Sequence, residues 1–441
     1  ENLYYNTSLS GSTLYYNGNI SAIQWGNSSH VKQFSQYKYD GLNRLISSSF
    51  HNSEISEVQT DKVPDFSEEF SYDKHGNITS LTHYGIVGEI FSASNPGTLL
   101  PSHDYRYGKI NQLTFSYQGN QLKRVQNAIS LSPMIEGTYY FPDKADKSVE
   151  YTYDANGNMI SDLNKELKSV SYTNLNLPKS LSFSSGKSNK YQYDALGNKL
   201  RMSHWVSTDL IFHPVLTSSL GSRDSLSVVV PKPPVTINTA IDKTDYCGNI
   251  IYENGTLSKI LTDEGFVSFV DNTPTYYFYI KDHQGNNRIL TKSSVLYAKK
   301  YDYYAFGGVY NNNSESQEVS PVGPIKPAAI SQNYLFGGKE IDRMNGLDWY
   351  DFGARAQDPL LGRFMSIDPL CEKYYSISPY VYCNNNPIKY VDPSGMFYST
   401  EVELNEDNTY TVVGGKADGD LNIYVTENGE RTGEVIGQSL T

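Results

Sequence analysis

Short runs in which aromatic and polar residues alternate recur along the chain, and each run is followed by a turn signal. Four copies agree closely: YKYDGLNRL (37–45), FSYDKHGNI (70–78), YTYDANGNMI (151–160) and YQYDALGNKL (191–200). Degenerate copies occupy 15–20, 116–122, 245–250 and 276–289. Tyr153, Tyr172 and Tyr193 are spaced 19 and 21 residues apart. A period of about 20 residues indicates a repeat architecture in which each unit buries its face against its neighbours.

One unit is predicted to form a β-hairpin. In Tyr151-Thr152-Tyr153 the two rings are two residues apart, so a strand places them on one face. Asp154 ends the strand because its side chain bonds to nearby backbone groups. Gly157-Asn158 supplies two residues that tolerate the positive φ of a tight reversal, and Met159-Ile160 begins the return strand. Helical periodicity is almost absent, so we expect an all-β fold.

The amino-acid composition argues against two classes of protein. Tyr accounts for 38 of 441 residues and much of the 38% hydrophobic content, so the buried surface would be rich in amphipathic rings. This composition argues against a conventional doubly wound enzyme. The net charge is −12, which argues against nucleic-acid binding by the repeats, because phosphate contacts need concentrated positive charge.

Cysteine and histidine give no sign of a disulfide framework, a metal or a cofactor. The three cysteines Cys247, Cys371 and Cys383 are too few to cross-link a chain of this size. All eight histidines lie at or before His283, and no pair has zinc spacing. No apolar run approaches the ~20 residues of a membrane span. The chain begins at Glu1 without a visible leader, so we expect it to be a piece of something longer.

Composition also changes along the chain. We expect repeats over 1–210, a proline-containing linker or insertion with a degenerate repeat over 211–275, and the last repeats with a distinct block over 276–396. A second loop is expected at 311–327. Residues 397–441 carry nine acidic and two basic side chains, a net of −7. Because that is more than half of the total charge, the tail is expected to be a separate module.

The repeats resemble the YD repeats of the RHS family of bacterial proteins. The resemblance rests on the signature Tyr-x-Tyr-Asp-x-x-Gly-Asn and covers most of residues 15–310. It implies that one long β-ribbon winds into a hollow shell around a C-terminal cargo, usually a toxin. It also implies a secreted or cell-surface bacterial protein, whose partners would be its own cargo, an immunity protein and secretion machinery.

The segment from Gly346 to Met396 resembles the RHS repeat-associated core domain. The matching blocks are DPLLGRF (358–364), NNP (385–387) and DPSG (392–395). The resemblance implies that this core closes the shell and cuts its own chain after the last block. Carried over by position, the cut falls between Met396 and Phe397, where the composition changes.

The same resemblance makes Asp368 and Asp392 candidates for an aspartyl-protease pair. One ionised carboxylate would activate water and a protonated partner would donate a proton. When two carboxyl groups lie close together, repulsion makes it unfavourable to ionise both, so their pKa values separate. Arg363 could balance the charge and polarise the carbonyl, and Lys389 could do likewise with less directional bonding.

Each of these residues also has a structural interpretation. Asp392-Pro393-Ser394-Gly395 has the sequence of a type I turn, Arg363 could serve packing or a salt bridge, and Lys389 could be solvated. Cys371 stands where cleaving members of the family have Gly, which removes the freedom for positive φ. A thiol nucleophile at Cys371 is rejected because no histidine lies within eighty residues to activate it.

The tail is expected to form short hairpins around Gly414-Gly415 and Asn428-Gly429. It contains no recognisable catalytic signature, so the chain is at most a single-turnover autoprotease. An alternative hypothesis is a structural or adhesive cell-surface protein that uses the repeats as a rigid scaffold without cleaving. Exposed tyrosines could then stack on carbohydrate.

Overall fold

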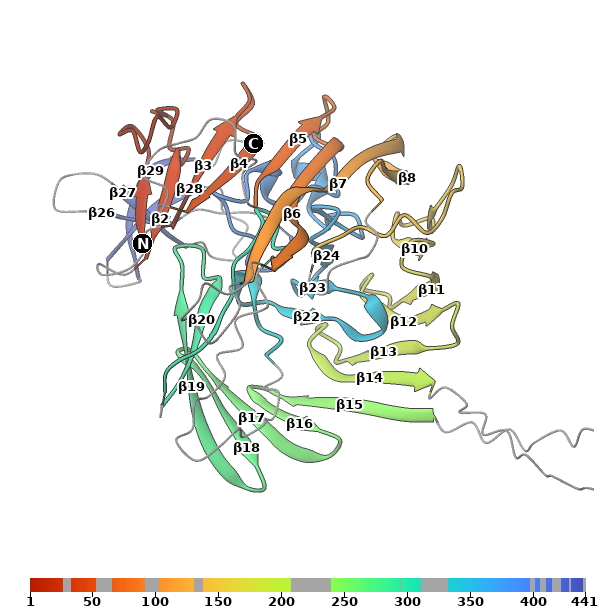
Figure 1. Ribbon diagram of the computed structural model, residues 1–441. Helices are drawn as coiled ribbons and strands as arrows, with labels where there is room; N and C mark the ends of the chain where they lie inside the picture. The colour runs from red at the N-terminus through yellow and green to blue at the C-terminus, as the bar shows by residue number, and fades with distance from the viewer. Residues whose placement is uncertain are drawn as a thin grey trace, which may run out of the picture.

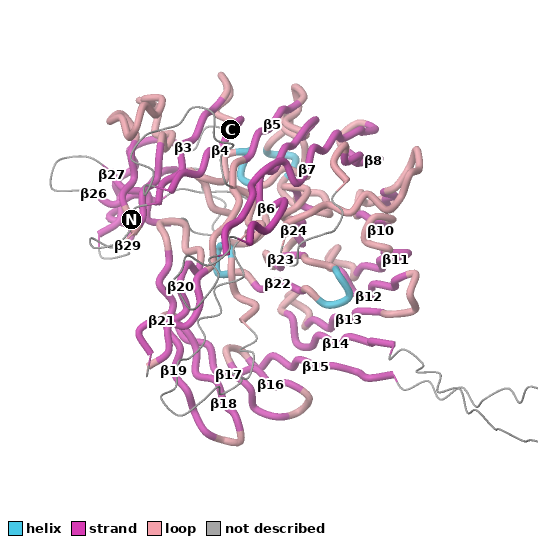
Figure 2. Tube along the Cα trace, viewed as in Figure 1, coloured by secondary structure: helices cyan, strands magenta, loops and turns pink. Residues whose placement is uncertain are grey.

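The chain forms two large antiparallel sheets that follow one another around a central segment (Figure 1). The computed structural model describes residues 1–26, 33–52, 66–91, 103–130, 138–207, 239–293, 295–310, 332–396, 401–404, 410–414, 422–427 and 430–438. Within these ranges the regular structure consists of strands and four one-turn 3-10 helices. Strands predominate in Figure 2. This confirms the predicted all-β fold. No helix in the described part of the chain is long and apolar enough to cross a membrane.

The first sheet has eight strands that pair in chain order. Its strands are β1 (Asn2–Tyr4), β2 (Ala22–Trp25), β3 (Gln33–Tyr39), β4 (Leu45–Asn52), β5 (Glu68–Tyr72), β6 (Ile78–Phe91), β7 (His103–Gln118) and β8 (Gln121–Asn127). Each strand is antiparallel to the next. Such a meander needs only hairpin connections between neighbouring strands.

The second sheet continues in the same way with thirteen strands. They are β9 (Tyr151–Tyr153), β10 (Met159–Asp162), β11 (Leu167–Tyr172), β12 (Pro178–Phe183), β13 (Ser188–Tyr193), β14 (Lys199–Ser207), β15 (Thr239–Cys247), β16 (Ile250–Glu253), β17 (Thr256–Thr262), β18 (Gly265–Val270), β19 (Thr273–Lys281), β20 (Asn287–Lys292) and β21 (Val295–Lys300). The end strands β9 and β21 do not pair with each other, so the described sheet is open. Of the segment expected as a linker, residues 208–238 lie outside the described residues, and from Thr239 the chain pairs with β14. The loop expected at 311–327 also lies outside them.

The hairpin unit forms as predicted, with one correction. Asp154 Oδ1 accepts hydrogen bonds from the backbone N–H groups of Asn156 (2.9 Å) and Asn158 (2.8 Å). Gly157 has a φ of +77°, but Asn158 does not lie in the left-handed region. Instead, the Asn158 amide donates to Asp154 Oδ2 at 3.0 Å. Asn158 therefore locks the turn through its side chain and not through an unusual backbone.

In six units the second tyrosine makes a bond that ties neighbouring hairpins together. Its hydroxyl donates to a backbone carbonyl oxygen at or just before the start of the return strand of an earlier hairpin. The pairs are Tyr39–Ile20, Tyr72–Leu45, Tyr117–Ile78, Tyr172–Met159, Tyr193–Pro178 and Tyr303–Asn287, at 2.5–2.9 Å. The first ring of a unit is buried more deeply, as at Tyr151, while the intervening Thr152 is exposed. The alternation predicted for the strand is therefore present.

The central segment contains a small sheet and four 3-10 turns. The sheet comprises β22 (Glu340–Asp342), β23 (Trp349–Asp351), β24 (Ala356–Asp358) and β25 (Arg363–Phe364), and the turns are η1 (Phe336–Gly338), η2 (Met344–Gly346), η3 (Cys371–Lys373) and η4 (Cys383–Asn385). The buried ring of Tyr382 lies 5.3 Å from Phe352 and 5.6 Å from Phe364. These rings belong to the buried hydrophobic core of the molecule. The central segment itself lies between the two large sheets (Figure 1).

The tail forms a third arrangement of strands. Its strands are β26 (Glu401–Leu404), β27 (Tyr410–Gly414), β28 (Asn422–Glu427) and β29 (Glu430–Gln438). β28 and β29 pair antiparallel, as a hairpin there requires, and the expected turn residues Asn428-Gly429 lie outside the described residues. The hairpin expected around Gly414-Gly415 is wrong, because β27 pairs with β26, and β26 pairs in parallel with β28. β26 therefore lies between β27 and β28 in this sheet, an order that the alternating pattern does not specify.

Candidate functional site: two aspartates around one arginine

The turn at Asp392 is closed by its own side chain. Asp392 Oδ1 accepts the backbone N–H groups of Ser394 at 3.2 Å and Gly395 at 2.6 Å. Gly395 has a φ of +74°, where a Cβ atom would approach the backbone of Arg355 to 3.0 Å. The local sequence therefore makes a tight turn and leaves Asp392 Oδ2 free to face inward.

Asp368 reaches the same place from a second turn. Its Oδ1 accepts the backbone N–H of Leu370 at 2.7 Å, and Cys371 N–H donates to the Asp368 carbonyl at 3.0 Å. Cys371 then starts the 3-10 turn η3, and it is not among the described residues with positive φ. Cysteine in place of glycine therefore does not disturb this turn.

Arg355 joins the two aspartates. Its Nη2 lies 3.0 Å from Asp368 Oδ2 and 3.5 Å from Asp392 Oδ2. The side chain is 3% exposed and comes from the short connection between β23 and β24. The sequence-predicted carboxylate pair is thus brought together around an arginine that the sequence analysis did not single out.

Burial and Arg355 act in opposite directions on the two carboxyl groups. Burial raises the pKa of Asp392 to about 6, although Arg355 and two backbone N–H groups lower it. Burial also raises the pKa of Asp368, against a lowering effect of Arg355. Because desolvation disfavours the charged form, each of the two carboxyl groups keeps its proton to a higher pH than an exposed aspartate does.

The backbone just before Met396 is held by three donors. Lys339 Nζ donates to the Pro393 carbonyl at 2.6 Å, and Ala354 N–H donates to the Ser394 carbonyl at 3.0 Å. Arg355 Nε donates to the Gly395 carbonyl. Three successive carbonyl oxygens are therefore fixed beside the aspartates. Met396 follows this turn, and Phe397 lies outside the described residues.

Arg363 and Lys389 lie elsewhere. Arg363 Nη2 donates to the Asn120 carbonyl at 2.9 Å, and its guanidinium lies over the Tyr380 ring at 4.8 Å. Lys389 Nζ donates to the Asn17 carbonyl at 3.1 Å. Neither cation forms an ion pair with Asp368 or Asp392 among the described residues. The cations beside the aspartate turn are instead Arg355, which follows β23, and Lys339, which follows η1.

Two thiols line the small cavity beside the aspartates. Cys371 is partly exposed and Cys383 is buried, and burial raises the pKa of both. Neither thiol is therefore activated as a nucleophile. Within the described residues, no group of three His, Cys, Asp or Glu side chains is arranged to hold a metal ion.

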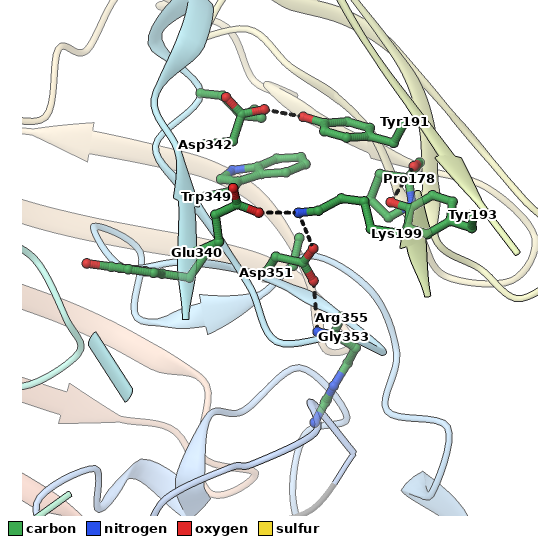
Figure 3. A pocket seen from close by; sticks show the side chains of 13 residues that line it. Pro178, Tyr191, Tyr193, Lys199, Glu340, Asp342, Trp349, Asp351, Gly353 and Arg355 are labelled. Carbon is green, nitrogen blue, oxygen red and sulfur yellow. Dashed lines mark hydrogen bonds and ion pairs between the residues drawn. The ribbon is translucent and has the colours of Figure 1, made fainter. Parts of the chain in front are cut away.

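A second charged cluster lies on the other side of the Arg355 connection. Figure 3 shows Lys199 of β14 between the carboxylates of Glu340 and Asp351, each at 2.7 Å. These charges link the second sheet to β22 and β23 of the core. Arg355 also lines the cavity beside this cluster.

The residues that sequence reasoning missed carry little local signal. Arg355 and Arg363 stand in the same block, DFGARAQDPLLGRF, and both are arginines near a turn. Lys339 follows a glycine pair with no periodic pattern around it. Only the fold decides which of these cations faces the aspartates.

Comparison with known proteins supports the resemblance seen in the repeats. No family model matches the chain. It is 24% identical to the tRNA nuclease WapA of Bacillus subtilis over 411 residues, which is 82% of this chain and 16% of that protein. It is 28% identical to the tRNA3(Ser)-specific nuclease WapA of Bacillus spizizenii over 172 residues, or 36% of this chain and 7% of that protein.

The match to the Bacillus subtilis protein covers 82% of this chain. The chain belongs to the RHS/YD-repeat family. The chain is also 34% identical to salivary gland surface protein 1 of Aedes aegypti over 138 residues, which is 31% of this chain and 4% of that protein. The chain thus spans less than a fifth of the length of each of these relatives.

Solved structures give a weaker likeness. The crystal structure of TcdB2-TccC3-Cdc42 aligns at a TM-score of 0.49 and 16% identity, over 86% of this RHS/YD-repeat chain and 18% of that chain. A structure of the Photorhabdus luminescens Tc holotoxin pore aligns at 0.48 and 16% identity, over 90% and 18%. The family assignment does not depend on them.

Proposed function

We propose that the chain is the end of a toxin shell whose core cuts its own backbone after Met396, releasing or retaining the module at 397–441. The observation that carries this proposal is the position of Arg355, which contacts both aspartates and the carbonyl of Gly395. The candidate acid and base are therefore fixed beside the backbone immediately before Met396.

The environments of the two carboxyl groups suit different roles. Asp392, the more deeply buried, holds its proton up to about pH 6 and serves as the general acid. Asp368, closer to Arg355, serves as the general base. Asp368 would accept a proton from water as the water oxygen bonds to the Met396 carbonyl carbon. Asp392 would protonate the leaving nitrogen of Phe397 as the peptide bond breaks.

The proposal extends to the whole chain. Residues 1–210 and 276–310 would form part of the hollow RHS shell, with 211–275 as an insertion, and the core would close it. The acidic module at 397–441 would begin the cargo. The family's secreted toxins are the basis for proposing export from a bacterial cell, with the cargo as the first partner of the shell.

A denaturing gel tests the proposal. The chain made in a cell-free system should lose its last 45 residues, about 5 kDa. Asp392→Asn should remain intact, and Asp194→Asn, which changes an aspartate in an exposed hairpin turn, should cleave normally. An intact wild-type chain would exclude self-cleavage, while leaving the repeat fold as it is.

The similarity to a salivary gland surface protein favours a second candidate, a non-cleaving surface scaffold. Tyr16 and Tyr375 are 81% and 87% exposed, so they could stack on carbohydrate. This candidate requires an intact wild-type chain on the same gel. It also requires glycan binding that is lost in Tyr16→Ala or Tyr375→Ala.

A further inference from the structure

The core touches the turns of the repeats. Ser378 N–H donates to the His75 carbonyl at 2.7 Å, and Asn385 Nδ2 donates to the Gly76 carbonyl at 2.8 Å. Both acceptors lie in the β5–β6 turn of the first sheet. Tyr380 donates its hydroxyl to the Gly157 carbonyl at 2.7 Å, in the β9–β10 turn of the second sheet. One short core segment therefore contacts turns from both sheets.

Other turns are contacted by the residues that follow. Asn386 Nδ2 donates to the Asn43 carbonyl at 2.8 Å and to Asn19 Oδ1 at 3.1 Å. His283 Nε2 lies 3.2 Å from the Ile388 carbonyl oxygen. The Asn-Asn-Pro block thus contacts turns that are far apart in the sequence, and it can do so only after those turns are side by side.

The turn contacts lead directly to the aspartates. Pro379 stands between Ser378 and Tyr380, and its carbonyl oxygen accepts Asp368 N–H at 3.0 Å and Arg355 Nη1 at 3.2 Å. Ile367, adjacent to Asp368, packs on Gly157 so closely that a Cβ there would lie 2.2 Å from Ile367 Cδ1. A shift of either turn would therefore move Asp368 and Arg355.

The backbone of this segment depends on its docking. Cys383, Asn384 and Asn385 have φ values of +47°, +49° and +58°. Left-handed backbone at a non-glycine residue is strained and persists only where the surroundings hold it. The contacts with the hairpin turns therefore help to hold these three residues in left-handed backbone.

We propose that Ser378, Tyr380 and Asn385 are positioning residues that couple the aspartate site to the hairpin turns of both sheets, so that cleavage proceeds only after the repeats are assembled. This inference rests on the proposed self-cleavage for its function. The physical coupling can be measured without it. Cleavage by the core would thus depend on its contacts with the assembled hairpin turns.

Tyr380→Phe tests the coupling with a matched control. It removes only the hydroxyl that reaches Gly157, whereas Tyr172→Phe removes an equivalent hydroxyl that reaches Met159 within the sheet. In cell-free synthesis, Tyr380→Phe should slow release of the 397–441 fragment about five- to tenfold, as loss of one buried hydrogen bond implies. Tyr172→Phe should release it at the wild-type rate.

A second readout does not depend on cleavage. Cys383 lines the aspartate cavity and is buried, whereas Cys247 is exposed. In an Asp392→Asn background, a thiol reagent should label Cys247 equally in all variants, and Cys383 faster in Tyr380→Phe and Asn385→Asp than in Tyr172→Phe. Asn272→Asp controls for the charge, because Asn272 is an exposed turn residue with a φ of +61°.

The outcomes separate the two proposals. If the wild type cleaves and Tyr380→Phe matches Tyr172→Phe in both rate and Cys383 labelling, the coupling is overturned and self-cleavage stands. If the wild type does not cleave, self-cleavage is overturned, and Cys383 labelling alone decides the coupling. Slower cleavage together with faster Cys383 labelling supports both.

Discussion

Asp392 is held by opposing forces that place its titration close to neutral pH. Its Oδ1 accepts two backbone N–H groups and its Oδ2 faces Arg355, and both contacts favour the carboxylate. Burial outweighs them and raises the pKa to about 6. The same residue can therefore close a turn with one oxygen and carry a proton on the other.

The rate of self-cleavage should fall as pH rises through about 6. The proposed general acid must be protonated, and Asp392 loses its proton at that pH. Above the pKa, the protonated fraction falls tenfold for each pH unit. A pH–rate profile from 5 to 8, measured on refolded chain, checks this. A constant rate over that range would rule out Asp392 as the acid.

Arg355→Gln should abolish cleavage, whereas Arg363→Gln should not. Removing Arg355 leaves two buried carboxyl groups without their cation and frees the Gly395 carbonyl. Breaking a buried pair costs roughly 3–5 kcal/mol. Urea denaturation and fragment release, measured on both variants, check the difference. Equal loss of cleavage in the two would mean that the arginine beside the aspartates has no special role.

The hairpin is the element in which local chemistry decides the structure. In Asp-x-x-Gly-Asn, every bond that closes the turn lies within four residues, as between Asp154 and Asn158. Glycine serves a second purpose at some turns. Gly157 contacts Ile367 of the core, whereas nothing lies within 4 Å of the Cβ position of Gly186.

Gly157→Ala should impair the core more than Gly186→Ala. Both residues have positive φ, +77° and +84°, so the backbone cost is similar. Only the new methyl group at 157 collides with Ile367 beside Asp368. Urea denaturation should show a larger loss of unfolding free energy for Gly157→Ala, by about 1–3 kcal/mol for overpacking. Equal losses would show that the core adapts to the methyl group.

The same locality explains what the sequence predicts. Strands, turns and the shared face of Tyr151 and Tyr153 follow from neighbouring residues, and the two aspartates follow from the core blocks. Arg355 does not, because it meets Asp392 across 37 residues and through a turn of the core. The contact of Asn385 could not be predicted from the sequence either, since its acceptor at Gly76 is 309 residues away.

At the scale of the whole molecule, the junction between the second sheet and the core contains an excess of buried acid. Asp162 and Asp358 are both buried beside the single cation Lys165, whose Nζ lies 3.1 Å from Asp358 Oδ2. Burial raises the pKa of Asp162 to about 7, with Lys165 lowering it and Asp358 raising it. Sheet and core are therefore joined by a contact that is sensitive to pH.

The chain should become less stable as pH rises from about 4 to about 7. The unfolded carboxyl group titrates near 3.9 and the folded one near 7, so the folded state binds the extra proton in this window. Urea denaturation at pH 5 and 7.5 should show a smaller decrease for Asp162→Asn than for the wild type. Asp146→Asn, at a side chain that is 96% exposed, should behave as the wild type. Identical decreases in all three proteins would contradict the assignment to Asp162.

The hydrogen bonds of the tyrosine hydroxyls all run in one direction along the ribbon. Each of the six bonds runs from a later hairpin to an earlier one. A hairpin leaving the ribosome is therefore finished by the one synthesised after it, and at 5–20 residues per second that takes only seconds. At these six junctions, the carbonyl oxygen of the earlier hairpin gains its hydroxyl donor only when the later hairpin has been synthesised.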